Sequence, residues 1–137
     1  MSTDDRTQDR TQDRTQDRSA IEQTIQTYFD GLYEGDADKL ASIFHETSAL
    51  TYEQDGQLVV LPLAQWLKAV RERPSPQAKG LARDDAILLI DQSGPTTALV
   101  KVKCQIPPRY FTDYLNLLKV GGRWLVAQKV FATVVKP

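Results

Sequence analysis

Residues 97–134 read TALVKVKCQIPPRYFTDYLNLLKVGGRWLVAQKVFATV. Within Thr97–Ile106, apolar and polar side chains alternate one by one, which is the period of a strand with one buried face. Pro107-Pro108 and Gly121-Gly122 are turn signals that divide the rest of the stretch into two further strands. The stretch therefore predicts three consecutive strands: Thr97–Ile106, Arg109–Val120 and Arg123–Val134.

The residues before this stretch predict three helices. Ser19 and Glu22 form a capping box that begins the first helix, and Gly35 ends it. Asp36 caps a second, short helix, and Pro62 suits the first turn of a third.

Three more strands complete the predicted sheet. Asp55-Gly56 is a hairpin signal between the strands Ser48–Gln54 and Leu58–Leu61, and Asp85–Gln92 is the strand that leads into Thr97. This order predicts an α+β fold, in which three N-terminal helices pack on a bent antiparallel sheet of about six strands. We expect the first helix to cross the concave face of the sheet.

Residues 3–18 are four copies of a tetrapeptide, TDDR once and TQDR three times. None of these residues is apolar, so burial cannot offset the entropy that ordering would cost. A helix would place Asp5, Asp9, Asp13 and Asp17 in one row, where like charges oppose each other. We therefore expect residues 1–18 to form a disordered tail without core contacts, and residues 19–137 to form one domain.

Composition and charge narrow the class of protein. Residues 19–137 carry 13 basic and 13 acidic side chains in scattered positions, whereas nucleic-acid-binding proteins usually show a basic patch. The single cysteine, Cys104, suits a reducing compartment, and no segment resembles a signal peptide or a membrane span. We expect a cytoplasmic protein that binds neither nucleic acid nor membrane. A single histidine, His45, excludes a multi-histidine metal site, and we expect no metal and no cofactor.

Three local signatures accompany this order of elements: Tyr28-x4-Tyr33-x-Gly35-Asp36, Phe44-His45, and the segment Phe111–Phe131 with Asp113, Trp124 and Lys129. With them, Ser19 to Val134 resembles the nuclear transport factor 2-like superfamily, which includes SnoaL-like and ketosteroid isomerase-like proteins. The subgroup labelled putative lumazine-binding is the most similar. The resemblance implies a cystatin-like cone of helices on a bent sheet, with a pocket between them. It implies no single activity, because the superfamily contains isomerases, cyclases, dehydratases and non-catalytic binders.

The resemblance suggests a role for Tyr28. In the similar ketosteroid isomerases, a tyrosine seven residues before the Gly-Asp helix junction donates a hydrogen bond to the developing oxyanion. Tyr28 stands at that spacing from Gly35. The alternative is a core tyrosine whose hydroxyl is satisfied within the protein.

The resemblance also suggests a role for Asp113. A protonated acid on the corresponding strand of the isomerases helps to form the oxyanion hole, and it aligns with Asp113 or Tyr114. The alternative is an aspartate at the sheet rim, paired with Arg109 or Lys129. A carboxylate in an otherwise apolar strand is costly if it is buried alone.

The catalytic base of the isomerases aligns with Tyr52 rather than with a carboxylate. Glu53 is the neighbouring residue and faces away by strand alternation, unless a one-residue bulge turns it inward. Steroid isomerisation is therefore not predicted, because a carboxyl group in an apolar pocket can act as a base but a tyrosine cannot near neutral pH. Which of Tyr52 and Glu53 faces the pocket stays open here.

Other residues have simpler interpretations. His45 suits a helix end, and Cys104 lies on the apolar face of its strand as inert core. Trp66 and Trp124 are typical core aromatics, and Trp66 on the third helix also suits the pocket mouth.

The sequence thus favours a small-molecule-binding domain in which Tyr28, Tyr52, Trp66 and Asp113 line one cavity. A cofactor-free isomerase, cyclase or dehydratase is the alternative, with Asp113 or Glu53 as acid/base and Tyr28 as hydrogen-bond donor. A non-catalytic dimerisation or interaction module is the second alternative. We also expect a homodimer through the outer face of the sheet, and the identity of the ligand stays open.

Overall fold

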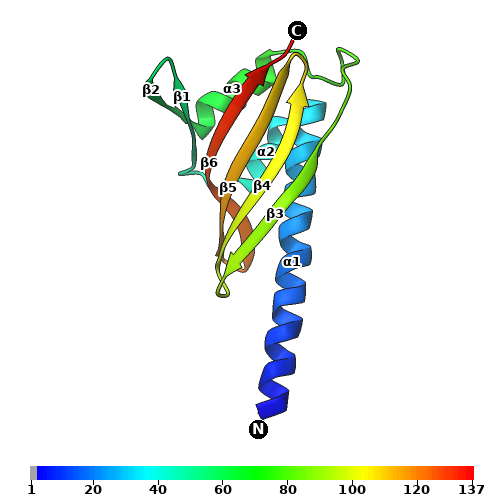
Figure 1. Cartoon of the computed structure of the whole chain (residues 1–137), viewed down its shortest axis with the longest axis vertical. Helices are drawn as coiled ribbons and strands as arrows, with labels where there is room; N and C mark the ends of the chain where they lie inside the picture. Colours follow the sequence, from blue (N-terminus) through cyan, green and yellow to red (C-terminus); the bar gives the residue numbers. More distant parts are fainter. Residues whose placement is uncertain (1–2) are drawn as a thin grey trace.

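The computed structural model describes residues 3–137, with side chains from residue 13 onward. The described chain contains three helices and six strands (Figure 1). In chain order they are α1 (Thr3–Glu34), α2 (Ala37–Ile43), β1 (Ala49–Gln54), β2 (Gln57–Pro62), α3 (Leu63–Glu72), β3 (Ala86–Ser93), β4 (Thr97–Ile106), β5 (Arg109–Val120) and β6 (Arg123–Val135). This confirms an α+β fold with the expected number of elements.

The predicted turn and cap residues form these boundaries. Asp36 caps α2, where its Oδ1 accepts a hydrogen bond from the Lys39 N–H at 3.1 Å. Asp55 and Gly56 both adopt positive φ angles, 52° and 79°, between β1 and β2. Pro62 stands immediately before α3, where its missing N–H costs no hydrogen bond.

The six strands form one sheet in the order β2-β1-β6-β5-β4-β3. Neighbours are antiparallel except β1 and β6, which run parallel and pair at Leu50–Lys129 and Thr51–Val130. The expectation of a wholly antiparallel sheet is therefore wrong, and the sheet is mixed. Turn signals identify hairpins between consecutive strands, but they carry no information on how two remote strands meet.

Helices α1 and α3 frame the inner face of the sheet, and the β1–β2 hairpin projects at its far edge (Figure 1). On α1, Ile21, Ile25 and Tyr28 are fully buried against the sheet, and Thr24 Oγ1 donates to the Trp124 carbonyl at 3.2 Å. The opposing core side chains come from the central strands, namely Val100, Val102, Leu115, Leu117 and Val126. This core fixes the positions of the elements that surround the site described below.

The expectation that residues 1–18 make no core contacts is wrong at Asp17. Helix α1 begins at Thr3 and passes through Ser19 without a break, so the capping box does not start it. Asp17 is 6 % exposed and accepts hydrogen bonds from Lys119, Trp124 and Gln92. Extending an existing helix costs less free energy than nucleating a new one. The three hydrogen bonds that Asp17 accepts stabilise this extension.

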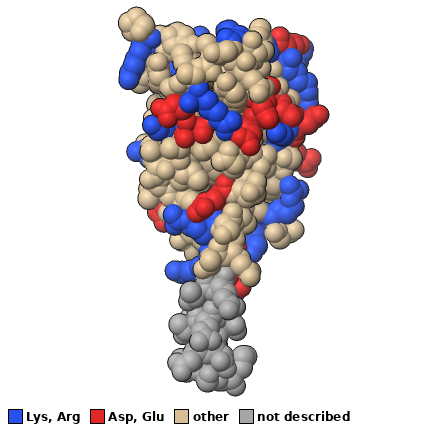
Figure 2. Space-filling view, turned by 90° about the vertical axis from the view of Figure 1, so that its right-hand side faces the viewer, with Lys and Arg blue, Asp and Glu red and all other residues tan. Residues whose placement is uncertain are grey.

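No helix within residues 3–137 combines the length and the apolar character that crossing a bilayer requires. On the face shown in Figure 2, basic and acidic side chains lie interspersed instead of forming a wide patch of one sign. No cluster of three metal-ligating side chains exists among the described residues.

Candidate functional site

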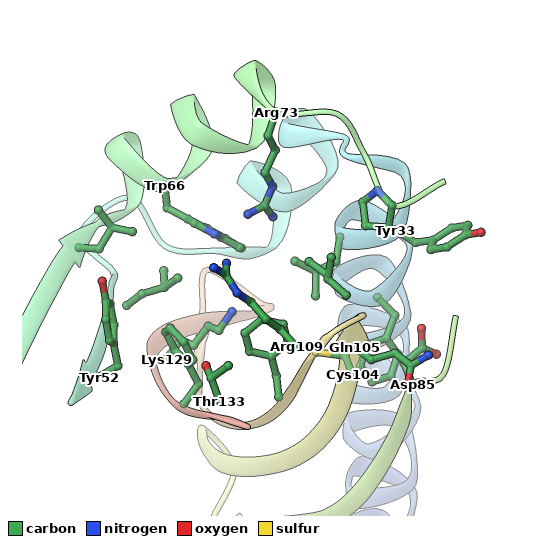
Figure 3. A pocket seen from close by; sticks show the side chains of 18 of the residues that line it. Tyr33, Tyr52, Trp66, Arg73, Asp85, Cys104, Gln105, Arg109, Lys129 and Thr133 are labelled. Atoms are coloured by element: carbon green, nitrogen blue, oxygen red, sulfur yellow. The ribbon is translucent and has the colours of Figure 1, made fainter. Parts of the chain in front are cut away.

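A cavity of about 460 Å³ lies between α1, α3 and the inner face of the sheet (Figure 3). This volume falls within the range of small-molecule sites. Its apolar lining consists mainly of Phe29, Leu32, Leu50, Leu61, Trp66, Ile106, Phe111 and Phe131. Its polar lining includes Tyr33, Tyr52, Glu53, Arg73, Arg83, Asp85, Cys104, Gln105, Arg109, Lys129 and Thr133.

Aromatic rings form much of the cavity wall. The Phe131 ring centroid lies 4.9 Å from that of Tyr52 and 6.1 Å from that of Phe111. On the α3 side, Trp66 packs edge-on against Phe44 with their centroids 5.3 Å apart. Such flat, rigid walls suit a flat aromatic or polycyclic ligand.

Lys129 is the most buried of the polar residues that line the cavity. Along β6, Trp124 and Val126 face the core, and strict alternation would turn residue 128 inward and Lys129 outward. The pairing of β5 with β6 instead shifts register at Asn116/Leu117, where a bulge re-aims the side chains that follow. Lys129 and Phe131 consequently point into the cavity, and the sequence gives no separate signal for the bulge.

The Lys129 ammonium group is surrounded by rings. Its Nζ lies 5.2 Å from the Tyr28 ring centroid, 4.8 Å from Trp66 and 5.0 Å from Phe131. The side chain is only 8 % exposed, and Asp113 Oδ2 at 3.9 Å is its ion-pair partner. No acceptor among the described residues lies within hydrogen-bond distance of Nζ. Its N–H donors therefore remain available to a ligand in the cavity.

Behind Lys129, Tyr28 and Asp113 form a buried hydrogen-bonded pair. The Tyr28 hydroxyl donates to Asp113 Oδ2 at 2.6 Å, and both side chains are fully buried. Burial raises the pKa of Tyr28 well above its usual range, and the Asp113 carboxylate raises it further. Tyr28 therefore keeps its proton and acts as a donor to Asp113. Asp113 Oδ1 has no hydrogen-bond partner among the described residues.

The structure differs from the predicted cavity at two residues, Tyr28 and Asp113. Tyr52 and Trp66 line it as expected, whereas Tyr28 and Asp113 lie behind the lining and reach it only through Lys129 and Cys104. Asp113 is also not at the sheet rim, because its strand partners Val102 and Phe131 place it on the inner face. That alternative also predicted a pairing with Arg109 or Lys129, and the structure does show the ion pair with Lys129.

Glu53 and Tyr52 both border the cavity, in different ways. Tyr52 is half-buried and its ring packs at a tilt against that of Phe131, so it faces the cavity as strand alternation predicts. Glu53 is exposed at the mouth, and its carboxylate accepts a hydrogen bond from the Gly56 N–H at 2.9 Å. The isomerase-like base position is thus occupied by an aromatic ring.

His45 and Cys104 do not form a nucleophilic pair. His45 Nδ1 contacts Thr47 Oγ1 at 2.7 Å, outside the cavity lining. Cys104 borders the cavity, but burial strongly raises the pKa of its thiol and the nearby Asp113 raises it further. A thiol that stays protonated is a weak nucleophile, so the interpretation of Cys104 as inert agrees with its surroundings.

Three arginines at the cavity were missed by sequence reasoning. Arg83 forms ion pairs with Asp30 at 2.6 Å and with Asp85 at 2.7 Å. Arg73 follows α3, Arg109 begins β5, and both guanidinium groups point into the cavity (Figure 3). They lie 36 residues apart in the chain, and no local pattern signals that they meet.

Comparisons with known proteins agree with this fold. The sequence profile of the family described as Putative lumazine-binding matches residues 16–132. Aldolase FrzH from Cladobotryum sp is 25 % identical over 114 residues, covering 82 % of this chain and 87 % of that protein.

Solved structures of similar proteins share the architecture. A nuclear transport factor 2-like protein of unknown function from Shewanella baltica is 27 % identical, with a TM-score of 0.77 over 89 % of this chain and 97 % of that one. One from Silicibacter pomeroyi is 19 % identical, with a TM-score of 0.78 over 88 % and 98 %. Since the family profile spans most of the sequence, this chain belongs to the Putative lumazine-binding family of the nuclear transport factor 2-like superfamily.

Proposed function

We propose that this chain binds a flat, oxygen-bearing small molecule in the cavity, with Lys129 as the hydrogen-bond donor that orients it. The observation that carries the proposal is the Lys129 ammonium group, which is 8 % exposed in the cavity wall and has no hydrogen-bond acceptor among the described residues. Because Lys129 lines the cavity and its ammonium group keeps free N–H donors, an oxygen on a ligand there would accept a charge-assisted hydrogen bond.

The surroundings of Lys129 explain how such a ligand would be held. Phe131, Tyr52 and Trp66 offer ring faces and edges to a planar body. The Asp113 carboxylate, at 3.9 Å, keeps the ammonium group on the cavity side of the Tyr28–Asp113 pair. A ligand with a ring and a carbonyl oxygen would satisfy both the apolar wall and the donor.

Lumazine, a fluorescent bicyclic ring with two carbonyl oxygens, is a suitable first probe. A fluorescence titration should give saturable binding at one molecule per chain, weakened about 10- to 150-fold by Lys129→Met, since a hydrogen bond to a charged group contributes about 1.5–3 kcal/mol. Lys101→Met is the matched control, because Lys101 lies over the Tyr114 ring outside the cavity lining. The proposal fails if lumazine does not bind and native mass spectrometry finds no small molecule on the purified chain.

A second candidate function is proton transfer beside a carbonyl group. It is favoured by the position of the Lys129 ammonium, where it would stabilise an oxyanion, and by the similarity to a protein named an aldolase. Glu53 is the lining carboxylate without an ion pair among the described residues, so it is the candidate base, while the Tyr28 hydroxyl is committed to Asp113. The chain would then accelerate deuterium exchange next to the carbonyl of acetophenone, and Glu53→Gln or Lys129→Met would abolish it.

The homodimer through the outer sheet face also stays a proposal. Leu89, Lys101, Tyr114 and Val130 are register partners in one row across β3 to β6, and Leu89 is 50 % exposed. A mixed apolar and charged row suits a partly wet twofold contact. Sedimentation at tens of micromolar should show a dimer that Tyr114→Arg dissociates. A cytoplasmic location likewise remains a proposal and rests on the single cysteine.

A further inference from the structure

The cavity lining carries an excess of positive charge. Four of its side chains are basic (Arg73, Arg83, Arg109 and Lys129) and two are acidic (Glu53 and Asp85). Neither carboxylate pairs with Arg73, Arg109 or Lys129. Asp85 pairs with Arg83, and Glu53 accepts from the Gly56 N–H in the hairpin turn.

Two of the four cations have no counter-charge among the described residues. Arg83 has two carboxylate partners, and Lys129 has Asp113. Arg73 and Arg109 form neither an ion pair nor a side-chain hydrogen bond within residues 13–137. A guanidinium group has five N–H donors in a fixed plane, so each of these arginines offers a complete set of unused donors.

The two guanidinium groups approach the same space from opposite sides. Figure 3 shows Arg73 reaching in from the end of α3 and Arg109 reaching towards it from the sheet, with Lys129 beside them on the cavity wall. Arg73 and Arg109 are both exposed as residues, but the Arg73 guanidinium lies inside the cavity, where burial lowers its pKa and the charge of Arg109 lowers it further. Two like charges held face to face without a counter-ion repel each other, and an anion between them would turn this cost into attraction.

The backbone on both sides holds this arrangement. The Arg73 N–H donates to the Ala69 carbonyl at 3.1 Å, which closes the last turn of α3. The loop that follows packs against Gly35, where an added Cβ would lie 2.7 Å from Ser75 Cβ. Arg109 is fixed by strand pairing with Ile106 and Val135. The guanidinium groups are therefore anchored by regular structure at their bases, which suits a built site.

We propose that the natural ligand of the cavity is an organic anion, whose carboxylate or phosphate group sits between Arg73 and Arg109 while its flat apolar body lies along Trp66, Tyr52 and Phe131. This inference rests on the proposed function and narrows it to a ligand class. Planar guanidinium forks match carboxylate and phosphate oxygens in paired hydrogen bonds, which a lysine ammonium does not. Lys129 would contact an oxygen on the ligand body deeper in the cavity.

Two fluorescent probes separate this inference from the proposed function. Anilinonaphthalene sulfonate and N-phenylnaphthylamine share one aromatic skeleton, but only the first carries an anion. Both should bind the wild-type cavity, the sulfonate more tightly. Arg73→Gln and Arg109→Gln should each weaken sulfonate binding about tenfold, and leave the neutral probe within about twofold.

A matched control is available two residues away. Arg71 is on the outer side of α3, pairs with Asp38 at 3.5 Å and lies outside this cavity, so Arg71→Gln should leave both affinities unchanged. Equal loss of both probes in the Arg73 and Arg109 variants, or no loss of the sulfonate, would overturn the anion inference while the cavity remained a binding site. If neither probe binds the wild type, the proposed function fails and the inference fails with it.

Discussion

The structure contains two buried aspartates on the contact between α1 and the sheet, and they differ in how fully they are satisfied. Asp17 uses both oxygens: Oδ1 accepts from Lys119 at 3.1 Å and from Trp124 Nε1 at 3.2 Å, and Oδ2 accepts from Gln92 at 3.1 Å. Asp113 uses one oxygen for Tyr28, Cys104 and Lys129, and its Oδ1 has no hydrogen-bond partner among the described residues.

We interpret this difference as one of role: Asp17 stabilises the fold, whereas Asp113 also holds groups that border the cavity. Asp17 is surrounded by donors that hold α1 on β5 and β6, and it does not line the cavity described above. Asp113 is separated from the cavity only by the Lys129 ammonium and the Cys104 thiol. Proteins keep an incompletely satisfied buried group mainly where it does something other than stabilise the fold.

The largest expected effect is that of Asp113→Ala. The change leaves the Lys129 charge and the Tyr28 hydroxyl buried without a partner, which should lower the free energy of unfolding by about 3–5 kcal/mol. Denaturant unfolding measures this loss, and Asp113→Asn, which keeps an acceptor, should lose less. Probe binding should also weaken in both variants. If Asp113→Asn leaves the affinity for the probe unchanged, then Asp113, like Asp17, only stabilises the fold.

Asp17→Ala should have a smaller effect, confined to stability. The substitution leaves Trp124 Nε1 buried without an acceptor, at a cost of about 2 kcal/mol, and probe affinity should not change. A chain that starts at residue 18 should show the same loss. Retention of wild-type stability by either variant would show that Asp17 does not dock α1.

The stabilising effect of Asp17 should also depend on pH. Burial raises the pKa of Asp17, but the hydrogen bonds from Lys119, Trp124 and Gln92 outweigh it, so the pKa is lower than the usual 3.8. A lowered pKa in the folded state means that the contribution is present above pH 3.8 and is lost as the pH falls through the folded value. The stability difference between wild type and Asp17→Asn should therefore shrink in acid.

The smallest expected effect concerns Tyr28. Its pKa in the folded state lies above the ordinary 10.0, so its stabilising contribution is complete below pH 10.0 and is lost as the pH rises through the folded value. Tyr28→Phe should cost about 1 kcal/mol at neutral pH. Ultraviolet titration should show one tyrosine of the five that ionises only when the chain unfolds. Ionisation of Tyr28 near pH 10 in the folded chain would contradict its burial against Asp113.

The sequence predicts most of the fold because the signals are local. Alternation over Thr97–Ile106, the turn at Asp55-Gly56 and the Asp36 cap each depend on neighbours in the chain, and each corresponds to the structure. The parallel contact of β1 with β6 depends on no such signal.

The site is less predictable because its parts come from remote positions. The Lys129 side chain points into the cavity because of a bulge in the β5–β6 pairing that no residue type signals. Arg73 and Arg109 come together only in the folded chain. Asp17 finds its donors 75 to 107 residues further along the chain. Tyr52 and Trp66 line the cavity because strand parity and helix face decide the direction of their side chains.

The two tryptophans can report separately on the cavity and on the Asp17 contact. Trp66 lies in the cavity wall, and Trp124 lies beside Asp17. A nitrogen–proton correlation spectrum shows one indole signal for each, and Asp17→Asn assigns that of Trp124. On titration with anilinonaphthalene sulfonate, the Trp66 indole signal should shift to saturation while that of Trp124 stays fixed. Movement of the Trp124 signal instead, or of neither signal at saturating probe, would contradict a ligand site in the cavity that Lys129 and the facing arginines border.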